Sequence, residues 1–356
     1  MASVGGIIMI MENNIRFNRQ FGPASEDDYL NYKNDYGLDF CDATRETEVK
    51  IIRNANRMVK AATTLFPGHR TPRVLNYYLP EIVLSAPLSD QDRLNINRRE
   101  TAIVAKKTVD AQKLIDKVPI VDCLEGFDDI IKRFHDSGVD ATFSDKPFHE
   151  ACGEWAGKRR VFWARSGFVD RLVVMGSILN SINLSLHFED AFRPVGVQEG
   201  LFRRRLGWTK ERYPDWSIDK VLEEAKSKTA VKPRLASHKA GAAADLRLRL
   251  DGAIVDFGHE YPDGGAIVYP LTPFITGAQC FNRQMLNIAS QISGLTMYMG
   301  EDWHVSYGDN LASIDASGNF KPDYVAKYGP VKSFDPTTGV VVDVYSEDEM
   351  GKIFDY

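Results

Sequence analysis

The sequence predicts a mixed α and β protein with a mostly helical N-terminal part. Residues 44–66 carry apolar side chains at helical spacing, and residues 98–117 have the pattern of a second helix. From residue 118 onward, short apolar or alternating segments follow one another between turn signals, a pattern typical of strands and helices in turn. We therefore expect a helical extension over residues 1–117 and a separate α+β domain over residues 118–356.

The two N-terminal helices follow from periodicity. In residues 44–66, Ile51, Met58 and Val59 contribute to an apolar stripe, and a proline follows the end of the segment. In residues 98–117 several lysines share a polar face, which we expect to be solvated rather than to bind a polyanion.

From residue 118 onward the sequence predicts shorter strands and helices. Strands are predicted at residues 118–122, 185–192, 246–250 and 303–307, and helices at 168–182 and 283–293. In residues 246–250 the leucines alternate with arginines, so Arg247 is expected to share a face with Asp245. Arg247 then either lines a cleft or is solvated.

Composition excludes several classes of protein. The 356 residues include 44 Lys+Arg and 49 Asp+Glu, a net charge of −5, with 44% hydrophobic residues. These values are those of an ordinary globular protein rather than a disordered, collagen-like or duplex-binding one. Four scattered cysteines without a CxxC pair indicate a reducing compartment. We find no signal segment and no apolar run of about 20 residues, so we expect a cytoplasmic protein without a membrane partner.

Three short segments contain the candidate catalytic residues and the candidate metal ligands. In SHKAGAAAD, His238 precedes Asp245 by seven residues, and in GEDWH, Glu301 precedes His304 by three. Two imidazoles and one carboxylate are the ligand count of a catalytic zinc site whose fourth position is open. Glu301 and His304 would lie on opposite faces of an extended strand, so we expect a bend at the preceding glycine.

The remaining roles of metal-assisted amide hydrolysis also have candidates. Glu301 could take a proton from water and pass it to the leaving amine. Arg193, in the segment DAFRP, could stabilise the oxyanion that develops on the substrate carbonyl.

These segments resemble the motifs of a known family. SHKAGAAAD is similar to the HxxGxAxD motif of the D-alanyl-D-alanine dipeptidases (VanX type), EDWH to their ExWH motif, and DAFRPVGVQ to their DAYRPxxxQ motif. The order and separations fit, and the resemblance extends over about residues 118–330.

The resemblance implies a fold and a reaction. It implies an α+β fold in which helices flank a central antiparallel sheet. It implies one zinc ion per chain on His238, Asp245 and His304, with Glu301 activating the zinc-bound water and Arg193 stabilising the transition state. The reaction implied is hydrolysis of the free dipeptide D-Ala-D-Ala to two D-alanines.

Other polar residues are open to two interpretations. Asp263, in the turn YPDGG, either binds the substrate ammonium or is an ordinary turn aspartate. His259 could lie beside the metal ligands or contact substrate, and otherwise packs as an ordinary histidine. The run Arg203-Arg204-Arg205 favours a solvated face or a carboxylate partner over nucleic acid, because the chain is acidic.

Three functions remain open. The first is a zinc dipeptidase acting on D-Ala-D-Ala. The second is a peptidoglycan hydrolase, a lysin that cuts a peptide stem and is anchored by its first 117 residues. The third is a non-catalytic zinc-binding relative, which an intact Glu301 and Arg193 argue against. The N-terminal extension could instead form a homo-oligomer interface or a lid.

Overall fold

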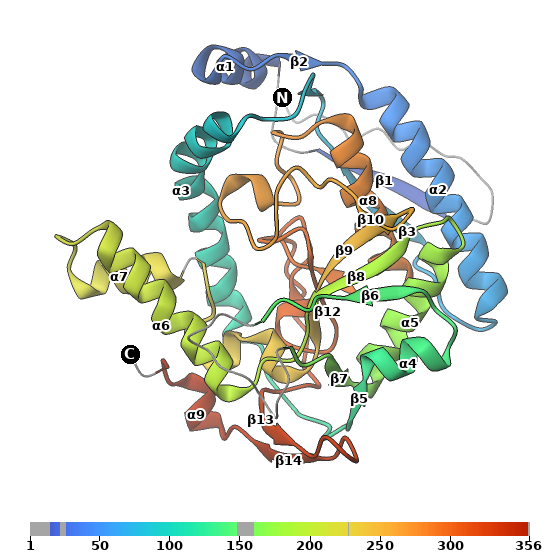
Figure 1. Cartoon of the computed structure of the whole chain (residues 1–356), viewed down its shortest axis with the longest axis vertical. Coiled ribbons are helices and arrows are strands. Elements are labelled where there is room, and N and C mark those ends of the chain that lie inside the picture. The colour runs from blue at the N-terminus through green and yellow to red at the C-terminus, as the bar shows by residue number, and fades with distance from the viewer. Residues whose placement is uncertain (1–14, 22–25, 148–159, 227, 355–356) are drawn as a thin grey trace.

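The computed structural model describes residues 15–21, 26–147, 160–226 and 228–354. A six-stranded sheet lies at the centre, with helices around it (Figure 1). Its order is β11–β12–β9–β8–β6, and β10 pairs with the far end of β9. The strands are β6 (Ala141–Phe143), β8 (Ser185–Asp190), β9 (Ala243–Leu250), β10 (Ala253–Ile254), β11 (Thr296–Met297) and β12 (His304–Ser306).

The sheet is mixed, which corrects the expectation of an antiparallel one. Strands β11, β12, β9 and β8 pair antiparallel, whereas β6 pairs parallel with β8. Parallel neighbours require a long crossover, and the chain between β6 and β8 contains the helix α5 (Ser166–Asn180). The predicted flanking helices are confirmed.

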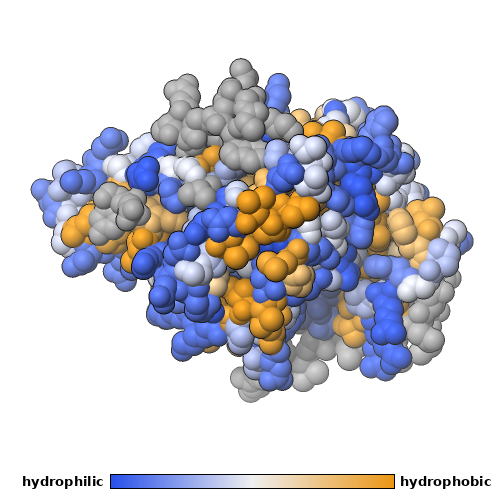
Figure 2. All heavy atoms as spheres, turned by 90° about the horizontal axis from the view of Figure 1, so that it is seen from below, coloured by the Kyte–Doolittle hydropathy of each residue, from blue (hydrophilic) through white to orange (hydrophobic). Residues whose placement is uncertain are grey.

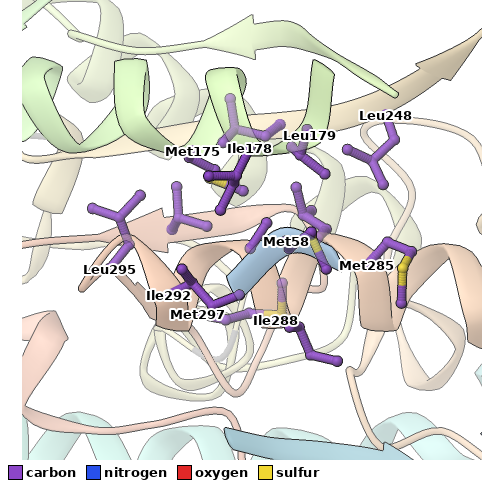
Figure 3. Close-up of a cluster of buried hydrophobic side chains, with 14 of the residues drawn as sticks. Met58, Met175, Ile178, Leu179, Leu248, Met285, Ile288, Ile292, Leu295 and Met297 are labelled. Carbon is purple, nitrogen blue, oxygen red and sulfur yellow. The ribbon is translucent and has the colours of Figure 1, made fainter. Parts of the chain in front are cut away.

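One large apolar core joins the sheet to three helices. The helices α5, α8 (Gly277–Ile292) and α2 (Thr44–Leu65) pack against one another. Figure 3 shows Met58 of α2 among side chains of α5, α8 and β9, and all of them are buried. The extension predicted for residues 1–117 therefore shares its core with the following part of the chain. The domain boundary near residue 117 stays a prediction.

The first helix is confirmed, and the second begins earlier than predicted. Helix α3 runs from Asp90 to Ile115, where residues 98–117 were expected. It starts at Ser89, whose hydroxyl and backbone N–H exchange hydrogen bonds with Asp92, so the cap rather than the apolar pattern sets the start. The strand predicted at residues 118–122 is wrong, because only Ile120 forms an isolated bridge.

The N-terminal region also contains strands, so its prediction as mostly helical was incomplete. Strand β1 (Arg16–Phe21) pairs parallel with β3 (Val74–Leu79). Strand β2 (Phe40–Cys41) pairs antiparallel with β4 (Val83–Leu84). These segments are separated in sequence by α1 (Glu26–Tyr36) and α2, so local periodicity could not pair them.

The other predicted elements are confirmed with shifted ends. The helix expected at 283–293 is α8, which begins at Gly277 because Thr276 and Gln279 form a capping box before it. The strand expected at 246–250 is β9, which extends back to Ala243 and so includes Asp245.

The remaining elements surround this core. They are α4 (Ile130–Asp136), α6 (Val195–Arg212), α7 (Ile218–Lys226), α9 (Glu347–Gly351), β5 (Phe127–Asp129), β7 (Trp163–Arg165), β13 (Val331–Phe334) and β14 (Val341–Val344), with short 3₁₀ turns η2 (Pro233–Leu235), η3 (Ser237–Ala240), η4 (Ala266–Val268) and η5 (Leu311–Ser313). Figure 2 shows apolar side chains among polar ones on the face seen from below. No helix in the described ranges is long and apolar enough to cross a bilayer.

Candidate metal centre and catalytic cavity

Three buried side chains from separate elements converge on one point. His238 lies in η3, Asp245 near the start of β9, and His304 at the start of β12. Asp245 and His304 are directly opposite each other in the antiparallel pairing of β9 with β12. One ligand atom from each of the three residues lies within 4.8 Å of the other two. The group predicted from sequence therefore assembles, and it could hold a metal ion.

Each histidine keeps one ring nitrogen for this group. His238 places Nδ1 2.6 Å from the carbonyl oxygen of Ala191, which leaves Nε2 3.3 Å from Asp245 Oδ1. His304 places Nε2 within 3.2 Å of the hydroxyls of Ser237 and Ser306, and its Nδ1 lies 3.0 Å from the same Asp245 oxygen. Partners on the outer nitrogen orient the ring and select its tautomer, as is usual for metal-binding histidines.

Asp245 is held as a carboxylate. Its Oδ2 accepts hydrogen bonds from Arg193 Nη2 at 3.1 Å and Tyr261 Oη at 2.8 Å, while Oδ1 faces the two imidazoles. Burial alone would raise the pKa of this carboxyl group, but the facing His238 and His304 lower it well below its ordinary value. The group thus offers a hard anionic oxygen beside two nitrogens, a donor set that suits zinc.

Glu301 lies beside this group and lines a cavity. Its Oε2 is 3.7 Å from His304 Nδ1, and its side chain is 37% exposed. Desolvation raises the pKa of Glu301, and the charge of Asp245 adds to the rise. A carboxyl group with a raised pKa is a better proton acceptor than an ordinary one.

The turn before β12, not a distorted strand, brings Glu301 and His304 together. Glu301 precedes the strand, so the alternation of side chains along a strand does not apply to it. The bend expected at Gly300 is present, because the chain turns at this residue, and its φ is not positive. A Cβ atom there would lie 2.6 Å from the ring of Tyr298, so the glycine leaves room for that ring.

Arg193 is fixed by three partners. Its Nε donates to Asp190 at 2.8 Å, Nη1 to Gln198 at 3.3 Å, and Nη2 to Asp245. Burial would lower the pKa of this guanidinium, but the two carboxylates raise it, so it stays charged. Three of five N–H donors are engaged, which leaves two to bind an oxyanion at the cavity wall.

A cavity of about 600 Å³ lies in front of these groups. Arg193, His238, Glu301 and His304 line it, and so does Asp263. The Asp263 carboxylate lies 3.8 Å from Arg93 of α3. Residues of α3, α6 and α7 form other parts of the wall, so the N-terminal region helps to enclose the site.

The comparison with known families agrees with this geometry. Residues 158–323 match the family model of peptidase M15, the D-ala-D-ala dipeptidases. The chain carries a domain of this family. The match includes the metal group, Glu301 and Arg193, and it leaves α2 and α3 outside. No curated protein sequence matches the chain.

Two further candidates of the matched region lie away from the metal group. His259 Nε2 is 2.9 Å from Asp302, which also receives Arg283 Nε at 2.9 Å, and all three side chains are buried. His259 therefore belongs to a buried polar cluster, and its ring meets the Trp303 ring edge-on at 5.1 Å. Arg247 is buried over the ring of Phe257 and does not line the cavity, so neither interpretation proposed for it is correct.

Sequence reasoning missed residues that support the ligands. Tyr261 binds Asp245 from a loop sixteen residues further along the chain, and no spacing signalled it. Ser306 lies two residues after His304 on β12 and accepts from its outer nitrogen while donating to Asp309 at 3.3 Å. Because side chains two apart on a strand share a face, that serine could have been proposed from the sequence.

Proposed function

We propose that the protein is a zinc-dependent peptidase that hydrolyses D-alanyl-D-alanine. The observation that carries this proposal is the convergence of His238, Asp245 and His304 beside Glu301, at the wall of one cavity. The family match supports the same reaction class.

The residues present fit a zinc ion. Both outer imidazole nitrogens have acceptors, both inner ones face the same carboxylate oxygen, and the three ligands are buried. A zinc ion bound there would lower the pKa of water and polarise the scissile carbonyl.

Glu301 and Arg193 would then perform the proton and charge steps. The Glu301 carboxylate accepts a proton from the attacking water and delivers it to the nitrogen of the leaving D-alanine. Arg193 lines the cavity, and its two remaining N–H donors would hold the negative charge that develops on the carbonyl oxygen. Asp190 and Gln198 keep that guanidinium in place throughout.

The substrate ammonium needs an anionic partner, and Asp263 is our candidate. It lines the cavity, and its nearest cation is Arg93 at 3.8 Å, a distance longer than a direct hydrogen bond. An ammonium group entering the cavity could therefore bind Asp263 without breaking a strong existing pair.

The test is D-alanine release from free D-Ala-D-Ala by zinc-loaded protein, with Glu301→Ala as the matched variant. We expect release by the wild type only, with zinc bound to both proteins. Absence of release from a wild-type protein that holds zinc would reject the dipeptidase proposal.

One observation favours a second candidate, a hydrolase of longer peptide stems. A cavity of about 600 Å³ is in the range that encloses drug-sized ligands, which are much larger than a dialanine. Cleavage of soluble peptidoglycan fragments in preference to the free dipeptide would identify this activity.

A further inference from the structure

Among the residues that the structure describes, three arginines line the cavity without a directly paired carboxylate. They are Arg98 of α3 and Arg205 and Arg212 of α6. Within the described ranges, none of them forms an ion pair or hydrogen bond with a carboxylate. The guanidinium of Arg205 lies 5.5 Å from the ring centre of Trp208, and that of Arg212 lies 5.6 Å from the ring centre of Tyr213. Arg205 also feels the charges of Glu224 and Glu301, without a direct ion pair to either. Helices α3 and α6 lie on the same side of the central sheet (Figure 1).

The other charged groups of the wall are neutralised. Lys228 pairs with Glu224 at 2.7 Å, and Arg193 pairs with Asp190 and Asp245. Asp263 faces Arg93, and Glu301 faces His304. The cavity therefore has a surplus of positive charge that comes from the three unpaired arginines, although the whole chain is acidic.

This surplus indicates an anionic ligand. Like charges that share a cavity with protein walls repel one another more strongly than they would in water. Arg205 is half-buried, and its burial lowers the pKa of the guanidinium although the charges of Glu224 and Glu301 act to raise it, a sign of a charge that has lost part of its hydration. A carboxylate would restore that interaction, because guanidinium groups bind carboxylates in a two-pronged geometry.

The number of arginines bears on the size of the ligand. One guanidinium suffices for the single carboxylate of a dialanine, so that substrate would leave most of these cations unpaired. A peptide with further carboxylates could neutralise them, and the cavity has room for one.

We propose that Arg98, Arg205 and Arg212 form an anion subsite that binds side-chain carboxylates of an acidic peptide substrate longer than a dipeptide. This inference rests on the proposed peptidase function of the same cavity and narrows its substrate class. It also gives the N-terminal region a role, because α3 supplies Arg98 and thereby part of the substrate-binding wall.

The experiment compares two tripeptides that differ in one charge, D-Ala-D-Ala-D-Glu and D-Ala-D-Ala-D-Gln. Binding is measured by calorimetry on the zinc-loaded full chain carrying Glu301→Gln, and KM and kcat are measured on the wild type. We expect the acidic peptide to bind roughly 10-fold more tightly, with the difference in KM rather than kcat.

Substitutions of the arginines test whether the preference for the acidic peptide arises at this subsite. Arg205→Gln and Arg98→Gln should each reduce the charge preference several-fold, and Arg205→Lys should retain most of it because the charge remains. The matched control is Lys210→Gln, an exposed cation of α6 outside the cavity, which should keep the full preference.

The outcomes separate this inference from the proposed function. Equal binding of the two peptides by the Glu301→Gln chain, together with equal KM values on the wild type, would overturn the subsite, even if both peptides were hydrolysed. The same preference in every folded arginine variant would overturn it as well. A charge preference without any hydrolysis would support the subsite and reject the peptidase function.

Discussion

Asp245 and His304 face each other across the antiparallel strands β9 and β12, with 3.0 Å between Oδ1 and Nδ1. The register of two strands therefore sets the distance between two candidate metal ligands that are 59 residues apart in sequence. His238 joins them from the short turn that leads into β9. A metal ion would connect all three.

Removing the charge of Asp245 should abolish metal binding. In Asp245→Asn the neutral amide cannot supply the anionic oxygen between the two imidazoles, so the zinc content should fall from about one per chain to near zero. Metal analysis after dialysis measures this. Asp343→Asn, on the exposed hairpin strand β14, serves as control and should retain zinc. Full zinc content in Asp245→Asn would contradict the ligand assignment.

Glu301→Gln should separate metal binding from catalysis. The amide keeps the shape of the side chain but cannot accept the proton, so turnover should fall roughly 10²–10⁴-fold while zinc stays bound. Peptide hydrolysis and metal analysis on the same preparation measure both properties. Near-normal turnover by this variant would show that another group is the base.

Tyr261→Phe should weaken zinc binding without removing a ligand. The phenol donates to Asp245 Oδ2 at 2.8 Å, and loss of such an orienting partner lowers metal affinity by about 10–100-fold. Competition with a chelator measures the change. Tyr345→Phe removes a buried hydroxyl that has no hydrogen-bond partner within the described ranges, and it should leave zinc affinity unchanged. Equal affinities of the two variants would exclude a role for Tyr261.

Gly241→Ala should destabilise the fold. Gly241 has φ +65°, and a Cβ there would lie 2.3 Å from the Phe127 ring, so the substitution combines backbone strain with a clash. We expect a loss of about 2–4 kcal/mol in the free energy of unfolding, measured with urea. Gly207→Ala, in α6 with open space around its Cβ position, should instead be neutral or stabilising. Equal effects would reject this explanation of the glycine in the first motif.

His187 should make stability depend on pH. Burial, together with the charges of Arg249 and Arg247, lowers the pKa of this histidine to about 4. Between pH 6.5 and 4 the unfolded state binds a proton that the folded state does not, so stability falls as the pH falls through this window. The penalty at pH 4.5 is about 2 kcal/mol.

The matched variant isolates this contribution. His187→Gln should lose less stability than the wild type between pH 7 and pH 4.5, as measured by urea unfolding at each pH. Because the two proteins share every other ionisable group, the contributions of those groups cancel in the comparison. Identical pH slopes would show that His187 titrates normally.

The sequence alone determined the chemistry of the centre. His238, Asp245, Glu301 and His304 lie in short motifs whose residue types match the needs of metal-assisted hydrolysis, and the structure brings them together. Helices such as α2 were also predictable, because a 3.6-residue period is a local property of the chain.

The tertiary structure decided what depends on contacts between distant segments. The parallel pairing of β6 with β8, the bond from Tyr261 to Asp245, and the approach of Arg98 to the cavity leave no trace in local periodicity. Arg247 shows the same limit, because its alternating pattern on β9 is clear while its burial depends on what covers that face. Spacing along a chain specifies the face on which a side chain lies, and only packing specifies what that face meets.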